Sequence, residues 1–496
     1  MSFASFPFLI FFLILIFIMS ITNAPYFKRF EEKKLQSMRH IILLIASYVF
    51  YGYWDSRFLL LMFFITFNAY FSALGISKNF GKPKGKFYVF LGICLPIIIL
   101  GIFKYFNFFA HTFSEAFGIN DSLTLNLILP IGISFYTFQS MSYTIDVQRK
   151  LIPVEKNFIH IALYIAFFPQ LVAGPIVKAN EFLPQLEESR NISLKNFEKG
   201  IQIFLMGLVK KIILADHLSV FVDDVYRTPE AFNSLTIFLA VISYAIQIYF
   251  DFSGYSDMAV GAAKCFGYDL PRNFNLPYLS SSITEFWLRW HISLSSWFRQ
   301  FVYIPLGGNR VKPLRWVFNM LVVWFLTGMW HGADWTFILW GVYYGVLLMI
   351  EKFYFNLTSL KYKNGLSKGD DKVGIFFKIF GHTYTIIVVL FGWIFFRAEN
   401  MSDAILILKR LFTFQTGISQ PFSWTFISVA ILIIGYFAAA LHSKKNPDKQ
   451  GRVIYEGYYP LVNLNTIKGI TIFLFVIGLI IIFAYTGNNP FVYFQF

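Results

Sequence analysis

Two histidines and several charged residues interrupt apolar sequence between residues 249 and 335. This stretch contains the segments YFDFSGYSDM, SITEFWLRWHISLSSWFRQFVYIPLGGNR and MWHGADW. An ionisable side chain at membrane depth is costly unless it is paired or hydrated, so the cluster indicates a working cavity. His291 and His331 directly follow Trp290 and Trp330, and imidazole titrates near neutral pH. The two histidines are therefore the first candidates for proton transfer, and the tryptophans are candidates for the cavity lining.

His291 lies in a segment that carries other polar side chains at helical spacing. On a helix over residues 283–300, Glu285 and Arg289 are four residues apart, the favourable orientation for an ion pair. Ser295 follows His291 by one helical turn. Glu285, Arg289 and Ser295 are candidates for lining a substrate tunnel. An amphipathic interfacial helix with a solvated polar face is the alternative explanation of the Glu285–Arg289 pair.

Four more tunnel-lining candidates lie upstream, in the segment FDFSGYSDM. They are Asp251, Ser253, Tyr255 and Asp257. The two aspartates either cap a broken helix or hold a partner side chain, and capping is the simpler explanation. For His331, which ends a nearly uncharged span, the alternative to catalysis is a histidine hydrogen-bonded for structural reasons.

The composition identifies an integral membrane protein. Of 496 residues, 57% are hydrophobic and only 14% are charged, which does not provide an ordinary water-facing surface. The net charge of +15 occurs as short clusters between apolar runs, so membrane orientation explains it better than nucleic-acid binding. Cys94 and Cys265 form neither a disulfide framework nor a metal motif. The sequence contains no motif for a metal or a bound cofactor.

The apolar runs predict an all-α polytopic membrane protein with about 11–13 transmembrane helices, because a span needs about 20 apolar residues. Candidate spans are 3–22, 38–54, 57–76, 87–103, 158–175, 198–220, 233–250, 315–334, 335–356, 374–396, 421–442 and 467–486. Shorter or more amphipathic segments, which are candidates for interfacial or re-entrant helices, are 105–118, 127–146, 283–305 and 401–413. Proline and glycine concentrate between 130 and 308, which favours an irregular core of broken helices.

Basic loops predict the orientation of the chain. The clusters within 28–39, 78–86, 310–315, 361–372 and 444–452 all fit the cytoplasmic side if the N-terminus is outside. The first 22 residues lack a basic start, so we expect a retained helix rather than a cleaved signal peptide. His331 is then expected near the far end of its span, deep beneath the cytoplasmic face. No polar connection is long enough to fold alone, so residues 1–496 are expected to form a single membrane domain.

A family resemblance follows from these motifs. WLRWHISLSSWFRQFVYIPLGGNR followed by LTGMWHGADWTFILWG resembles the membrane-bound O-acyltransferase (MBOAT) family. The resemblance is strongest to its bacterial branch, which O-acetylates alginate, other exopolysaccharides or peptidoglycan. YFDFSGYSDMAVG, LPIGISFYTFQSMSYTIDV and AFFPQLVAGPIV are similar to further signature blocks of that branch. The dense part of the match, about 125–345, is the expected catalytic core.

The resemblance implies many helices around a central funnel or tunnel, with His331 essential and His291 functionally required. It also implies an acyl group taken from a cytoplasmic donor, acetyl-CoA in the acetylating members. This group is passed across the bacterial cytoplasmic (inner) membrane to a separate extracytoplasmic transferase, which modifies the polysaccharide. The chain contains no GDS-type serine block for that last step, consistent with a partner of the SGNH type.

Two other functional classes stay open at this point. Buried ionisable residues and broken helices are also features of secondary transporters and channels, although the sequence shows no repeated half-pattern. A membrane subunit that recruits a glycan enzyme without catalysis is the third possibility.

Overall fold

The computed structural model describes residues 1–24, 26, 30–119, 124–188, 190, 192–357, 371–420, 423–442, 444–447, 453–456, 461–485 and 487. These residues are predominantly helical, as the apolar runs predict. The exception is an antiparallel hairpin of β1 (Lys444–Pro447) and β2 (Val453–Glu456). The predicted helical class is confirmed, and the hairpin is an addition that the sequence did not indicate.

The chain divides into two compact units. The first contains residues 1–208 and 255–271, and the second contains residues 209–254 and 272–496. One long helix, α12 (Ser234–Cys265), contributes to both units. The expectation of a single domain over the whole chain stays a prediction.

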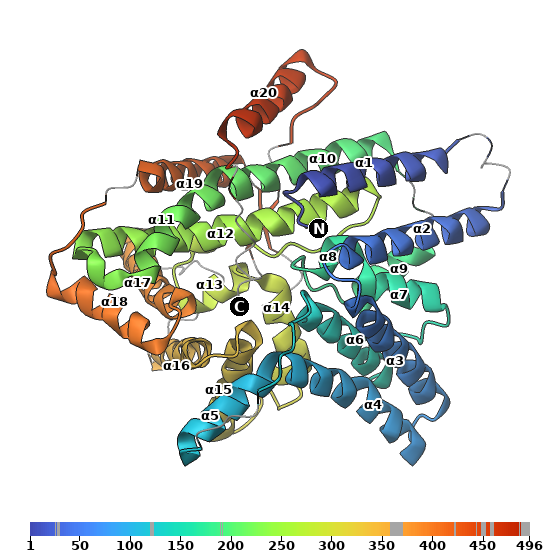
Figure 1. Cartoon of the computed structure of the whole chain (residues 1–496), viewed down its shortest axis with the longest axis horizontal. Coiled ribbons are helices and arrows are strands. Elements are labelled where there is room, and N and C mark those ends of the chain that lie inside the picture. Colours follow the sequence, from blue (N-terminus) through green and yellow to red (C-terminus); the bar gives the residue numbers. More distant parts are fainter. Residues whose placement is uncertain are drawn as a thin grey trace. The chain divides into compact units, whose positions relative to one another are not determined.

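Ten helices form most of the described part of the first unit (Figure 1). They are α1 (Phe6–Ile21), α2 (Glu32–Gly52), α3 (Phe58–Lys78), α4 (Pro83–Leu100), α5 (Phe106–Phe117), α6 (Ile133–Gln148), α7 (Phe158–Ala166), α8 (Phe168–Leu171), α9 (Ala179–Glu187) and α10 (Leu194–Val209). Helix α6 packs against α3 and α4, and its residues from Ile133 to Val147 are all buried. Ser140, Ser142 and Thr144 are tolerated there because their hydroxyls donate to carbonyls of their own helix, as Ser140 does to Thr137.

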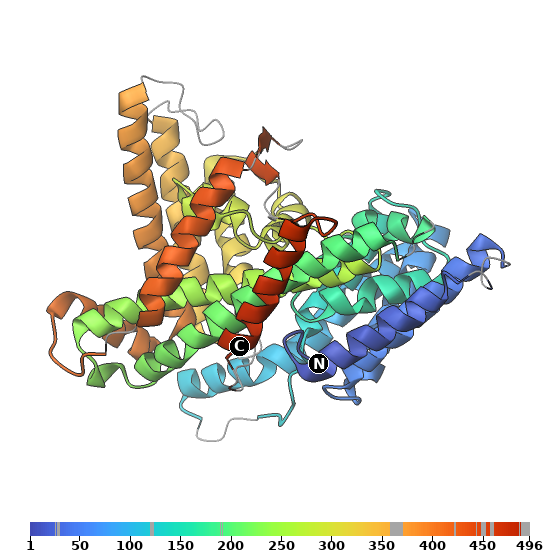
Figure 2. The same ribbon diagram turned by 90° about the horizontal axis from the view of Figure 1, so that it is seen from above.

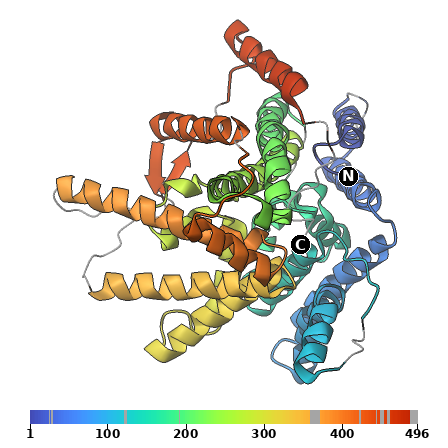
Figure 3. The same ribbon diagram turned by 60° about the vertical axis from the view of Figure 1, so that its left-hand side comes forward.

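The second unit contains the segments that carry His291 and His331. Its helices after the shared α12 are α13 (Ile283–Arg289), α14 (Ile292–Phe298), α15 (Pro313–His331), α16 (Trp335–Leu357), α17 (Asp371–Arg397), α18 (Met401–Thr413), α19 (Ser423–His442) and α20 (Ile467–Phe483), and α11 (Asp216–Arg227) precedes α12. Helix α16 packs against both α15 and α17, and Figures 2 and 3 show these gold and orange helices side by side. This group of three helices supports the His331 site.

Several predicted boundaries change in the structure, and the helix expected over 283–300 is divided near His291 into α13 and α14. Segments 87–103 and 105–118 are one long helical stretch, because a π-helical turn, η2 (Gly101–Tyr105), joins α4 to α5. The span predicted over 158–175 is instead broken at Phe167 into α7 and α8. A π-helical turn adds residues without ending a helix, whereas the non-helical backbone at Phe167 ends one.

Five helices are long and apolar enough to cross a membrane among the described residues, by length and composition. They cover Phe58–Lys78, Pro83–Phe117, Ser234–Cys265, Trp335–Tyr354 and Ile379–Arg397, and shorter apolar helices cover Phe6–Ile21, Trp424–Gly435 and Ile467–Phe483. Large apolar side chains are exposed along α1, α4, α5 and α20, as expected for surfaces that face lipid. Residues 361–370 and parts of the basic loops 28–39 and 444–452 lie outside the described residues, so the number and direction of crossings stay predictions.

Candidate functional site

His291 occupies a strained position between two short helices. Helix α13 ends at Arg289, and His291 precedes α14 with a left-handed backbone, φ +43°. This conformation is uncommon for a residue with a Cβ atom. The side chain is enclosed, with 1% exposure for the residue, and its ring centroid lies 4.6 Å from that of Phe252. Burial lowers the pKa of His291 to about 3, so the ring is neutral at physiological pH.

His331 is the last residue of α15 and lies among aromatic rings. Its centroid is 4.9 Å from Trp330, 4.9 Å from Trp340 and 5.1 Å from Phe396, with each ring pair nearly perpendicular. The residue is 4% exposed. A C-terminal helical turn carries carbonyl groups without helical partners, and their partial negative charge stabilises an imidazolium. The location therefore suits a histidine that accepts a proton.

Trp330 brings the two histidines into one cluster. Its ring centroid is 5.7 Å from His291 and 4.9 Å from His331. Both imidazoles therefore lie next to the same indole within the second unit. Trp290 is buried elsewhere, with its ring centroid 5.0 Å from Phe274.

Glycines allow α15 and α16 to approach closely at the histidine. A Cβ atom on Gly341 of α16 would lie 2.3 Å from the carbonyl oxygen of Trp324 on α15. A Cβ atom on Gly332, directly after His331, would lie 2.2 Å from the Phe337 ring. Small residues at such crossings let two helices pack backbone to backbone. The glycine in the Trp-His-Gly block is thus needed for space beside the Phe337 ring.

The predicted Glu285–Arg289 ion pair is present in α13. Arg289 donates to Glu285, which also accepts from the backbone N–H and the hydroxyl of Ser281, at 2.9 and 3.0 Å. The two charged side chains are only 12% and 9% exposed, so the solvated polar face is the wrong explanation. The pair stabilises the short helix that leads to His291.

Glu351 of α16 anchors the other end of α13. Its carboxylate accepts hydrogen bonds from the backbone N–H groups of Ile283 and Thr284, both at 2.8 Å, and from the Thr284 hydroxyl. These N–H groups have no partner within a helix, so the buried carboxylate supplies one. Trp340, eleven residues earlier on the same helix, contacts His331. Helix α16 therefore links the supports of both histidines.

We expect Glu351→Leu to lower the free energy of unfolding by roughly 1–3 kcal/mol, because it leaves buried N–H groups without an acceptor. Glu351→Gln keeps a neutral acceptor and should lose less. Thermal unfolding of the purified protein in detergent, followed by tryptophan fluorescence, measures both variants. Equal unfolding temperatures for the leucine variant and the wild type would show that α13 does not depend on this carboxylate.

The capping explanation of Asp251 and Asp257 is wrong, because α12 continues without a break through both positions. Asp251 instead holds a partner side chain. The Lys211 ammonium lies 2.8 Å from Asp251 and 2.8 Å from Asp216, and all three residues are buried. Lys211 belongs to a π-helical turn, η3 (Lys210–Ala215), between α10 and α11. This triad resolves the problem of a charge inside an apolar helix by pairing it.

The remaining predicted lining residues are divided between the two units. Ser253 is buried in the second unit and its hydroxyl makes no hydrogen bond to another described residue. Tyr255 and Asp257 belong to the first unit, where the Tyr255 ring lies 4.7 Å from Phe3. Ser295 lies one turn beyond His291 and is half-buried, as the spacing predicted.

Several residues at the site were missed by sequence reasoning. Lys211 left a usable signal, because it lies in the apolar run IQIFLMGLVKKIILA. Asn273, in the loop before α13, gave no such signal, because an asparagine in a loop is ordinary. Glu351 resembled a charge at a helix end, and Trp340 and Phe396 resembled packing residues.

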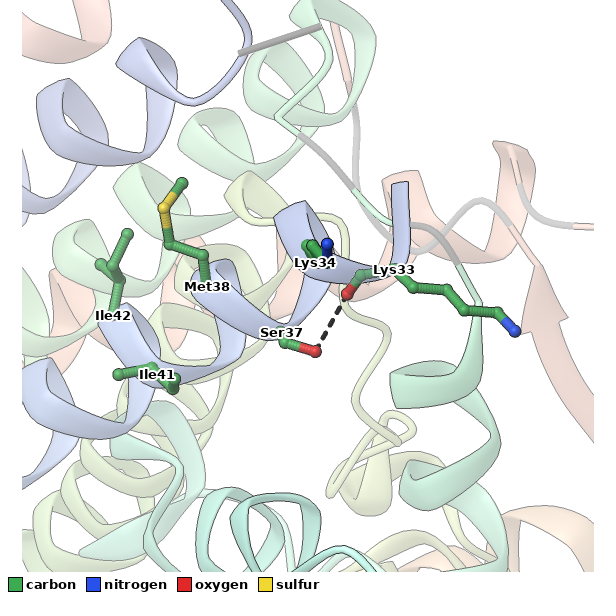
Figure 4. Close-up of a pocket in the computed structure, with 6 residues that line it drawn as sticks. All are labelled: Lys33, Lys34, Ser37, Met38, Ile41 and Ile42. Carbon is green, nitrogen blue, oxygen red and sulfur yellow. Dashed lines mark hydrogen bonds between the residues drawn. The ribbon is translucent and has the colours of Figure 1, made fainter. Parts of the chain in front are cut away.

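Other kinds of site find little support in the described residues. No group of three or more His, Cys, Asp or Glu side chains is placed to hold a metal ion within this part of the chain. A surface depression lies along one helix, α2, and contains none of the predicted site residues (Figure 4). It is lined by Lys33, Lys34, Ser37, Met38, Ile41 and Ile42. A depression formed by one helix face does not enclose a substrate.

Comparison with known proteins identifies the family to which this chain belongs. The model of the membrane-bound O-acyltransferase family matches residues 43–392, which include both histidines. The chain belongs to the MBOAT family. It is 34% identical to the probable alginate O-acetylase AlgI of Pseudomonas putida, over 93% of this chain and 95% of that protein. It is 37% identical to a peptidoglycan O-acetyltransferase of Helicobacter pylori, over 74% and 73% of the two chains. A teichoic acid D-alanyltransferase of Bacillus subtilis is 29% identical over 48% of this chain and 62% of its own length.

Membership of the MBOAT family settles the class of protein. This chain is a polytopic helical membrane protein of an acyltransferase family, with bacterial relatives that modify polysaccharide, peptidoglycan or teichoic acid. The cluster of His291, Trp330 and His331 is the candidate site at which acyl transfer can be tested in this chain.

Proposed function

We propose that this protein takes an acyl group, most simply acetyl, from a cytoplasmic thioester and passes it across the membrane for O-acetylation of an extracytoplasmic polysaccharide. Acetyl-CoA is the proposed donor and an SGNH-type transferase is the proposed partner. The observation that carries the proposal is the pair of buried imidazoles that both lie next to Trp330 in an MBOAT chain. The O-acetylase and O-acetyltransferase relatives support acetyl rather than a longer acyl group.

The chemistry requires a proton acceptor next to the reacting carbonyl. A hydroxyl oxygen attacks the thioester carbon, the carbon–sulfur bond breaks, and the hydroxyl proton ends on the leaving thiolate. We assign to His331 the role of general base, which takes this proton and returns it to sulfur. The helix terminus beside the ring stabilises the transient imidazolium.

The membrane arrangement belongs to the same proposal. We place the protein in the bacterial cytoplasmic membrane with its N-terminus outside, because the basic loops then face the cytoplasm. His331 then lies towards the outer end of its span, and a funnel or tunnel would have to lead the donor to it. A bilayer-buried base that water reaches poorly suits a thioester, which hydrolyses where water is plentiful.

Purified protein in vesicles, supplied with acetyl-labelled acetyl-CoA, tests this function directly. We expect release of free CoA and transfer of label to a hydroxyl acceptor, both dependent on His331. His111→Asn is the matched control, because His111 is an exposed histidine on α5. CoA release at the same rate from wild type and His331→Asn vesicles would contradict the proposal. An ion flux in place of acetyl transfer would favour the transporter class instead.

A further inference from the structure

Asn273 is tied to the start of α14 by several hydrogen bonds. It lies in the loop before α13, and is 1% exposed. Its backbone carbonyl accepts from the Ile292 N–H at 2.9 Å. Its side-chain oxygen accepts from the Ser293 N–H at 3.2 Å and from the Ser293 hydroxyl at 2.6 Å. The residues directly after His291 are therefore fixed on Asn273.

The same bonds determine which way the Asn273 amide points. A backbone N–H is always a donor, so the amide atom that faces the Ser293 N–H must be the oxygen. This removes the ambiguity between oxygen and nitrogen that usually affects asparagine side chains. The Asn273 oxygen can therefore be treated as an acceptor in any further contact.

His291 makes such a contact through one of its ring nitrogens. Its Nδ1 atom lies 3.4 Å from the Asn273 oxygen. Because that oxygen has no hydrogen to give, the hydrogen bond requires a proton on Nδ1. A neutral imidazole carries a single N–H, so its Nε2 atom then has a lone pair and no proton.

We propose that Asn273 is a positioning residue that fixes His291 in the Nδ1–H tautomer, which makes Nε2 a hydrogen-bond acceptor and not a donor. This inference rests on the proposed acyl transfer. It decides the chemical role of His291, which the proposed function does not specify. An Nε2 atom without a proton cannot donate to the oxyanion of a tetrahedral intermediate, so His291 is not the oxyanion donor.

Nitrogen-15 NMR of the whole protein, labelled at histidine and embedded in lipid, tests the tautomer without any assay of activity. The signals that disappear in His291→Asn identify His291. In the wild type we expect a protonated Nδ1 and an unprotonated Nε2. Asn273→Asp keeps an acceptor oxygen and should retain this tautomer, whereas Asn273→Leu should lose it. Ser293→Ala is the matched control, because it removes a competing donor and leaves the Asn273 oxygen in place.

A wild-type spectrum with the proton on Nε2 would overturn the proposal, and so would an unchanged tautomer in Asn273→Leu. The wild-type spectrum decides the first point even if the leucine variant does not fold. In the acetyl-transfer assay we expect Asn273→Leu to lose roughly 10- to 100-fold in kcat/KM, a typical cost of misplacing a reacting group. Asn273→Asp should recover most of that loss, which a merely structural role would not require.

The NMR spectrum tests this inference, and the acetyl-transfer assay tests the proposed function, so the failure of one can be told from the failure of the other. If no variant and no wild-type protein transfers acetyl groups, but the tautomer is as expected, the proposed function fails and the role of Asn273 stands. If transfer is normal and the wild-type tautomer is the reverse, the role of Asn273 fails and the proposed function stands.

Discussion

Replacing His331 by asparagine should reduce acetyl transfer about 10²- to 10⁴-fold, the usual contribution of a general base. Asparagine retains a polar side chain of similar reach but takes no proton near neutral pH. The rings of Trp330, Trp340 and Phe396 enclose the site, so bulk water is a poor substitute for the missing base. The measurement is the initial rate of transfer from acetyl-CoA per mole of inserted protein.

The level of inserted protein and its unfolding temperature are the controls for this variant. Both should match the wild type, and His111→Asn should be normal in all three measurements. A His331→Asn protein that transfers acetyl groups at more than about a tenth of the wild-type rate would remove the base role. His331 would then be one of the many buried histidines that serve structure alone.

Replacing Lys211 by methionine should lower the free energy of unfolding by about 3–5 kcal/mol, the cost of removing one partner from a buried ion pair. Methionine has a similar length and fills the space of the lysine stem. It leaves the carboxylates of Asp216 and Asp251 facing each other without the ammonium that lies 2.8 Å from both. Thermal unfolding in detergent, followed by tryptophan fluorescence, measures the loss.

The chain provides a matched control in the Lys264–Asp269 pair. Its nitrogen and oxygen are 2.7 Å apart, but the aspartate side chain is 63% exposed. An exposed pair contributes about 0–1 kcal/mol, so Lys264→Met should change the unfolding temperature much less. If the two methionine variants unfold at the same temperature, the buried triad does not stabilise the second unit.

The lengths of the apolar runs predicted most helices because membrane spans need both length and low polarity. The segments 315–334, 335–356 and 401–413 correspond closely to α15, α16 and α18. The apolar pattern misled where a charged side chain is paired with a residue far away in the chain. Asp251 suggested a broken helix because its partner, Lys211, lies forty residues away in the chain and no spacing rule connects them.

The residues of the candidate site that could be predicted are those whose type is unusual in apolar sequence. An imidazole in apolar sequence is conspicuous, so His291 and His331 were singled out, and the structure places both beside Trp330. Their supports are common residue types in common places. Asn273 and Glu351 act through hydrogen bonds to backbone N–H groups of α13 and α14, and such bonds depend on tertiary contacts that local sequence does not encode.

The left-handed backbone of His291 has a consequence for engineering this protein. Glycine adopts that conformation at no steric cost and asparagine adopts it more readily than most residues, so either would relax the turn between α13 and α14. A search for thermostable variants that measures only heat resistance would accordingly enrich substitutions at position 291. It would select proteins that survive heating by discarding the imidazole, so enrichment for durability has to be coupled to a screen for turnover.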